Sequence, residues 1–146
     1  MTDEAMPGPV DFILIEFPAD ASTASTAEAM TDLLNAGIVR LYDIVLIRKG
    51  GDGSTHRVDL GQATDGDGRE FAAFAGAQSG LFDDNDVRQA ADALEPDTAG
   101  LLIAFENAWA SPFVTAAHGA GGQVVASDRI PAQVLIEALE EVESAL

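Results

Sequence analysis

The chain has 146 residues, 47% of them hydrophobic, and contains no cysteine. This length fits one domain with a sizeable core, and the lack of cysteine excludes thiol nucleophiles, thiolate zinc sites and disulfides. A formal net charge of −18, from 25 Asp and Glu against 7 Lys and Arg, opposes contact with phosphate backbones and anionic lipids. We therefore expect no nucleic-acid partner and no membrane partner, and interpret the charge as a means of solubility.

Residues 1–9 carry two prolines, a glycine and two acids, which is typical of a flexible acidic tail. They lack the basic stretch and apolar core of a secretory signal, and no apolar run approaches the roughly 20 residues that cross a bilayer. We expect a cytoplasmic protein whose residues 10–146 form a single α+β domain.

The first half of this domain predicts a strand, a helix, a second strand and a hairpin. Val10 to Phe17 is apolar on both faces, which favours a central strand. Ser22, Thr23 or Ser25 can cap the helix, and Ser25 has capping-box spacing to Glu28. Gly37 suits the left-handed end of the helix. Val39 to Lys49 predicts a long strand, and the short polar segment after the 50–54 turn predicts an edge strand.

In the long strand, strict alternation places Leu41, Val45 and Ile47 on one face. The same alternation places Tyr42, Ile44 and Leu46 on the other face.

The second half alternates helices and strands again. Glu70 to Phe82 is rich in Ala and Gly and predicts a helix, and the acids after it offer N-caps for another helix ending near Leu94. A buried strand at 99–106, a short helix at 111–118 and a last strand at 123–126 follow. Pro131 opens a C-terminal helix with an apolar stripe of Val134, Leu135, Leu139, Val142 and Leu146.

Two segments share one pattern of strand, helix, glycine and strand: residues 10 to about 49, and residues 99–126. Two such units packed together give a ferredoxin-like fold, an antiparallel sheet with helices on one face. A sandwich with parallel strands is the alternative.

Three phrases carry a resemblance to a known family: VDFILIEF at 10–17, VRLYDIVLIRK at 39–49 and LLIAFENAWA at 101–110. They resemble a bacterial family catalogued as domain of unknown function number 6325. The resemblance covers nearly the whole chain beyond the tail and implies a ferredoxin-like fold, with no activity, cofactor or catalytic residue attached. The chain also resembles, distantly, a wider family often called membrane-associated, but here the apolar middle segment, 71–82, is short and ends in acids.

Glu106 and Trp109 are the first candidate site residues, because they follow a buried strand where the chain leaves the sheet. Glu106 could act as a general base or cation ligand, or neutralise the start of the next helix. Glu16 ends the first strand in the equivalent place and could share a site with Glu106, although pairing of one of them with Arg40 or Arg48 is the commoner arrangement.

His118 lies at the end of the short helix, where a protonated imidazole is favoured, and is a candidate ligand-binding residue or a cap. No residue pattern matches a metal site, and we expect no cofactor. The favoured interpretation is a non-enzymatic protein that acts through self-association, as a homodimer, or through a protein partner. The alternatives are an enzyme or small-ligand binder with a pocket near Glu106, Glu16 and Trp109, and a cation-binding acidic protein.

The dimer is expected through the sheet itself. If helices cover only one face, the face with Tyr42, Ile44 and Leu46 is left for another subunit. The alternative is that the middle segment, Phe71 to Phe82, folds over that face and leaves a monomer.

Overall fold

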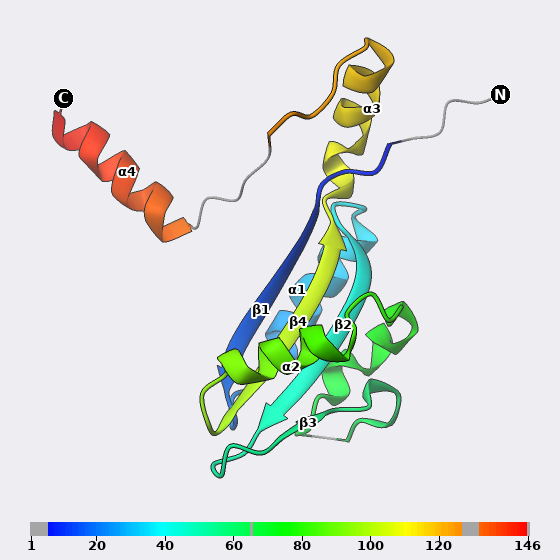
Figure 1. Ribbon diagram of the computed structural model, residues 1–146, viewed down its shortest axis with the longest axis vertical. Helices are drawn as coiled ribbons and strands as arrows, with labels where there is room; N and C mark the ends of the chain where they lie inside the picture. Colours follow the sequence, from blue (N-terminus) through cyan, green and yellow to red (C-terminus); the bar gives the residue numbers. More distant parts are fainter. Residues whose placement is uncertain (1–5, 65, 127–131, 146) are drawn as a thin grey trace. The chain divides into compact units, whose positions relative to one another are not determined.

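The computed structural model describes residues 6–64, 66–126 and 132–145 (Figure 1). The chain forms two compact units, residues 1–116 (unit 1) and residues 117–146 (unit 2).

Unit 1 is built on a four-stranded sheet in which every neighbouring pair is antiparallel. The strands are β1 (Val10–Pro18), β2 (Arg40–Lys49), β3 (Thr55–Arg57) and β4 (Thr98–Glu106), in the spatial order β1-β4-β2-β3. This confirms the α+β class, the antiparallel sheet and the edge position of the hairpin's second strand, β3. The central position expected for β1 is wrong, because β1 forms the other edge.

The helices of the chain are short. Unit 1 contains the α-helices α1 (Ala24–Asn35) and α2 (Asp84–Ala93) and the 3₁₀ helices η1 (Leu60–Gln62), η2 (Arg69–Ala77) and η3 (Ala108–Ala110). The helix α3 (Ser111–Gly119) begins in unit 1 and ends in unit 2, which also contains α4 (Ala132–Ala145). The predicted helix at 70–82 is therefore a 3₁₀ helix that ends at Ala77.

Local sequence signals predict the left-handed Gly37 at the end of α1 and the N-cap of α2, and both are confirmed. A side-chain cap predicted at the start of α1 is absent. Gly37 follows α1 with a φ of +71°, a conformation that glycine adopts without steric cost. Asp83 caps α2 in a capping box with Asp86. The N-cap residue of α1 is Thr23, one of the three expected candidates, but no side-chain hydrogen bond caps this helix. The hydroxyl of Thr23 donates to Glu70 of η2.

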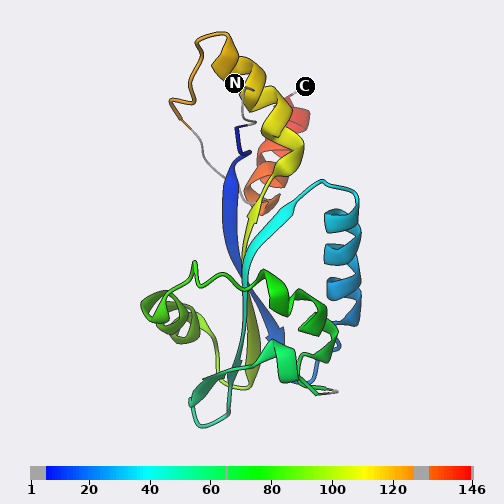
Figure 2. The ribbon, with the colours of Figure 1, turned by 90° about the vertical axis from the view of Figure 1, so that its right-hand side faces the viewer.

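Two separate hydrophobic cores lie on opposite faces of the sheet. Figure 2 shows α1 on one side of the sheet and α2 on the other. One face, here called the α1 face, is covered by α1 and η2 and includes Ile44, Leu46, Leu101 and Ile103. The other, the α2 face, is covered by α2 and Phe82 and includes Val45, Ile47, Leu102 and Ala104. The expectation that all helices lie on one face is wrong, because α2 covers the second face.

A β-bulge between Leu41 and Asp43 changes the faces of β2. One extra residue shifts the alternation of side chains by one position, so Leu41 packs with Ile44 on the α1 face and Tyr42 packs with Val45 on the α2 face. The predicted grouping of Tyr42 with Ile44 is therefore wrong. Because both faces are covered over β2, Ile44 belongs to the core and is not open to another subunit.

Asp43, at this bulge, is fully buried and holds the segment after η2 against the strand. Its Oδ1 atom accepts hydrogen bonds from the backbone N–H of Ile44 at 2.9 Å and of Ser79 at 3.3 Å. Its Oδ2 atom accepts from the N–H of Phe82 at 2.9 Å. These bonds let the chain pass from the α1 face, where Phe71 packs, to the α2 face, where Phe82 packs.

Two expectations concern the ends of the chain. Residues 1–5 of the predicted tail, Pro131 and Leu146 lie outside the described residues. Met6 donates its N–H to the hydroxyl of Thr115 at 2.9 Å, and the carbonyl of Pro9 accepts from the N–H of Asn107 at 2.8 Å. Residues 6–9 are thus tied to unit 1.

The predicted last strand, Gln123–Ala126, is absent from the described part of unit 2. Val124 and Val125 are exposed there. A four-residue extended segment is not stable as a strand without a neighbouring strand, and the second strand–helix–strand repeat is therefore incomplete.

We predict that Asp43→Ala lowers the free energy of unfolding by about 2–4 kcal/mol, because it leaves three backbone N–H groups without their acceptor in a buried site. Urea denaturation followed by circular dichroism measures the change. The control is Asp92→Ala on the exposed side of α2, with an expected change within about 0.5 kcal/mol. Equal effects of the two variants would contradict the anchoring role of Asp43.

Candidate functional site

Glu106 ends β4 and is 1% exposed. Its Oε1 atom accepts a hydrogen bond from the hydroxyl of Tyr42 and forms an ion pair with the guanidinium of Arg40 at 3.2 Å. Its Oε2 atom accepts from the backbone N–H of Gly8 at 2.9 Å. The carboxylate therefore joins β4, β2 and the segment that leads into β1, and this pairing with Arg40 is the arrangement that the sequence favoured over a shared acidic site.

The surroundings of Glu106 stabilise its charged form. The hydrogen bond from Tyr42 lowers the pKa of Glu106, as do the N–H of Gly8 and the charge of Arg40, while burial acts in the opposite direction. Conversely, the hydrogen bond to Glu106 raises the pKa of Tyr42, with burial and the negative charge of Glu106 adding to the effect. A carboxylate whose two oxygens both have protein donors is suited to holding segments together.

The other predicted site residues lie elsewhere. In the β1–β4 register, Val10 lies opposite Glu106 and Glu16 lies opposite Gly100. Glu16 and Glu106 are thus at opposite ends of the sheet, and Glu16 accepts a hydrogen bond from the N–H of Glu95 at 2.8 Å.

Trp109 lies in η3 with an exposed ring. Its indole N–H donates to the side-chain oxygen of Asn107 at 3.3 Å, and its backbone N–H donates to the carbonyl of Ile38 at 3.1 Å. His118, in unit 2, is exposed in the last turn of α3. In the described part of unit 1, no hydrogen bond or ion pair joins Glu106 to Trp109 or to Glu16.

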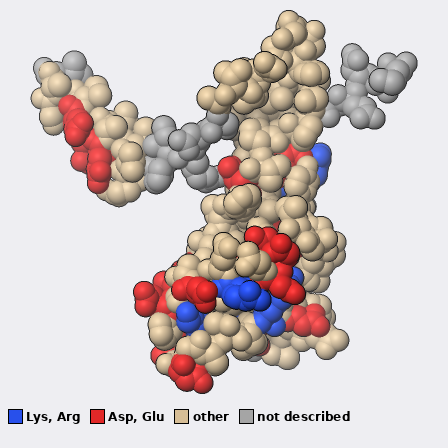
Figure 3. All heavy atoms as spheres, in the orientation of Figure 1, with Lys and Arg blue, Asp and Glu red and all other residues tan. Residues whose placement is uncertain are grey.

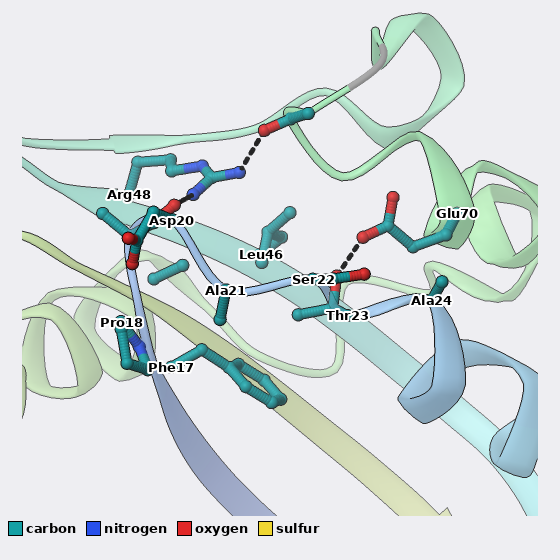
Figure 4. A pocket seen from close by; sticks show the side chains of 13 residues that line it. Phe17, Pro18, Asp20, Ala21, Ser22, Thr23, Ala24, Leu46, Arg48 and Glu70 are labelled. Atoms are coloured by element: carbon teal, nitrogen blue, oxygen red, sulfur yellow. Dashed lines mark hydrogen bonds between the residues drawn. The ribbon is translucent and has the colours of Figure 1, made fainter.

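A polar pocket of about 450 Å³ lies between the loop after β1 and the η2 region (Figure 4). Arg48 crosses it, donating to Asp67 at 2.8 Å and to the carbonyls of Ala19 and Gly66 at 3.2 and 3.0 Å. At the other end, Thr23 donates to Glu70. The polar side chains of this pocket bind one another and tie three loops together, and no motif in the sequence predicts the pocket.

Two apolar grooves flank β1, one on each face of the sheet. The α2 groove has a volume of about 640 Å³ and is lined by Phe12, Leu14, Leu81, Phe82 and other side chains. The α1 groove has a volume of about 410 Å³ and is lined by Ile13, Ile15, Met30, Phe105 and other side chains of β1, α1 and β4. The sequence signal for these two grooves is the run of apolar residues on both faces of Val10–Phe17. The same run predicts a central strand, which is why the grooves were not expected.

The two edges of the sheet differ sharply in how their backbone is satisfied. On the outer side of β2, β3 pairs with Ile47 to Lys49. Beyond β3, the carbonyls of Leu46, Ile44 and Tyr42 accept hydrogen bonds from Val58 N–H at 2.9 Å, Gln78 Nε2 at 2.9 Å and Ser79 Oγ at 2.6 Å. On the outer side of β1, no strand among the described residues pairs with the nine-residue strand. We call this side of β1 the open edge.

Charged side chains are unevenly distributed. Figure 3 shows Asp and Glu gathered around α2 and along one side of α4, whereas the visible surface of α3 is uncharged. Within the described ranges, no three His, Asp or Glu side chains are grouped as a metal site would require. Nor does that part of the chain contain a helix with the length and apolar character needed to cross a bilayer.

The chain matches the model of the family of unknown function DUF6325 over residues 6–145. Since this is nearly the whole sequence, the chain belongs to that family, which confirms the resemblance seen in the strand sequences. No curated protein and no solved structure matches it.

We predict that Glu106→Gln lowers the free energy of unfolding by about 1–3 kcal/mol at neutral pH, because charge-assisted hydrogen bonds are replaced by weaker ones. Since the folded state lowers the pKa of Glu106, its contribution to stability is complete above the pKa of an unfolded glutamate, about 4.3. That contribution is lost as the pH falls through the lower, folded-state pKa. The stability difference between wild type and variant should therefore narrow below about pH 4.

Urea denaturation at a series of pH values tests this. Glu141→Gln, on the exposed side of α4, removes one negative charge from a different place and is the matched control. A difference between wild type and Glu106→Gln that stays constant down to pH 3 would contradict the role given to this carboxylate.

Proposed function

We propose that this protein acts by self-association, and that the open edge of β1 is the surface that binds a second copy. The contrast between the two edges carries the proposal. Folded proteins protect exposed edge strands with short length, proline, lysine, bulges or covering segments. The β3 edge has such protection, since β3 has three residues and Gln78 and Ser79 extend its cover.

In β1 such features are confined to the ends, where Asp11, Glu16 and Pro18 lie, and the central residues 12–15 carry no charge, proline or bulge. The strand pairs with β4 over nine consecutive residues without a bulge, contains no lysine or arginine, and has its single proline at the last position. Phe12 is 69% exposed and Val10 is also exposed. A long, regular and apolar edge is a template for pairing with another strand.

A second β1 strand suits this edge. Two copies related by a two-fold axis perpendicular to the sheet would pair antiparallel and keep each face of the sheet continuous. When the two-fold axis lies at any residue from 12 to 15, neither Asp11 nor Glu16 lies opposite an acidic residue of the other copy. Residues paired across two strands share a face of the sheet, whereas Asp11 and Glu16 lie on opposite faces. Apolar residues such as Ile13 and Leu14 meet their counterparts instead.

The charge of the chain opposes association from a distance. Two copies with a formal charge of −18 each repel one another, and salt screens that repulsion. We therefore expect the dimer to form more readily as the ionic strength rises, with apolar contact and backbone hydrogen bonds as its attractive terms.

We predict that Phe12→Lys weakens the dimer by about ten- to a hundredfold, because it removes apolar contact worth about 1.5–3 kcal/mol and places a charge beside the edge. Sedimentation equilibrium over a dilution series measures the dissociation constant. Phe113→Lys is the matched control, since Phe113 is likewise 69% exposed but lies on α3, outside both grooves. A wild-type protein that is monomeric at every concentration and salt level would overturn the proposal.

A further inference from the structure

The helix α4 has an apolar stripe that nothing in the described part of unit 2 covers. Leu135, Leu139 and Val142 follow one another at helical spacing and are exposed. Glu137, Glu140 and other acids occupy the opposite side, which is visible as a line of red side chains in Figure 3. A helix of this kind is stable in water when its stripe packs against another apolar surface.

Unit 1 has a surface of complementary character in the α1 groove. The groove lies between α1 and β1, and its lining includes Ile13, Ile15, Met30, Leu33 and Phe105. Among the residues that the structure describes, Ser25 and Thr26 are the only polar ones in its lining, and none of the lining side chains is charged. With 14 residues, α4 is about 21 Å long, close to the roughly 18 Å of the 12-residue α1 that forms one wall.

The α2 groove is a poorer match for α4. Its lining includes the carboxylate of Asp86, at the start of a helix whose first turn also carries Asp84. A helix with four glutamates between residues 137 and 143 would meet like charge there, at a cost in free energy. The uncharged α1 groove accepts the stripe and leaves the acids of α4 in solvent.

We infer that α4 of a second copy binds in the α1 groove. This inference rests on the proposed self-association, which brings a second copy to the strand that forms the other wall of the groove. Ile13 and Ile15 belong both to the open edge and to the groove, so strand pairing and helix docking form one continuous interface. Helix-in-groove binding with anchors spaced three and four residues apart is a common mode of protein recognition.

Cysteine cross-linking tests the contact directly, because the chain contains no cysteine of its own. One variant carries Ala29→Cys, in the lining of the groove. The other carries Ala138→Cys, one turn from Leu135 and Val142 on the stripe, and has a tag of different length. After mixing and mild oxidation, a disulfide between the two different chains is expected on a non-reducing gel.

Ser144→Cys is the matched control for position. It lies on the same helix but on the side opposite Leu135, so mixing it with Ala29→Cys should give at least tenfold less cross-linked product. Equal cross-linking by Ser144→Cys and Ala138→Cys would mean that α4 has no fixed orientation in the groove, and the inference would be wrong.

The possible failures are distinguishable. If sedimentation shows a dimer and the mixed variants do not cross-link, α4 binds elsewhere and the self-association stands. If the double variant Ala29→Cys and Ala138→Cys forms its disulfide within single chains at high dilution while the mixed variants do not react, the occupant is not a second copy and the inference fails. If the wild-type chain is monomeric throughout, both proposals fail together.

Discussion

The backbone hydrogen bonds along the edges of the sheet are the constraint on which the rest of unit 1 depends. Each peptide group of a strand needs a partner on both sides of the sheet or contact with water. Between β1 and β4, and between β4 and β2, the ladders supply those partners. At the outer side of β2, a short strand and two side chains, Gln78 and Ser79, complete the pairing. At the outer side of β1, the corresponding groups are the binding surface of the proposed dimer.

Two buried acids, Asp43 and Glu106, hold in place the segments that lie next to the two edges of the sheet. Asp43 accepts three backbone hydrogen bonds and keeps residues 79–82 beside β2, so the protection of that edge depends on it. Glu106 binds Gly8 and Tyr42 and fixes the chain as it enters β1. Burial of a carboxylate is costly unless its oxygens receive hydrogen bonds, and both acids meet that condition. The hydrogen bonds of the two carboxylates are sufficient to explain why both are buried.

Much of the fold could be predicted from sequence because its signals are local. The strand boundaries, the Asp83 cap and the left-handed Gly37 follow from residue types at short spacing. The bulge at Leu41–Asp43 could not be predicted, since it depends on pairing with β4 and on contacts of Asp43 with residues 36 to 39 positions further on. The same non-local contacts move Phe82 to the second face, which is why the single helix-covered face was wrong. The hydrogen bonds of Glu106 could not be predicted either, because its partners Gly8 and Tyr42 are 98 and 64 residues away along the chain.

The asymmetry of the two edges also bears on why association through β1 would stop at two copies. A chain with two open edges can add further copies without limit, as fibrils do. Here the β3 edge offers a three-residue strand with exposed His56 and Arg57, and its continuation along β2 is occupied by side chains. Pairing of β1 with β1 therefore uses the only long strand edge left open among the described residues, and the two-fold axis closes the assembly. The charge of −18 on each chain works in the same direction, because repulsion grows with every added copy while the apolar contact at β1 can form only once.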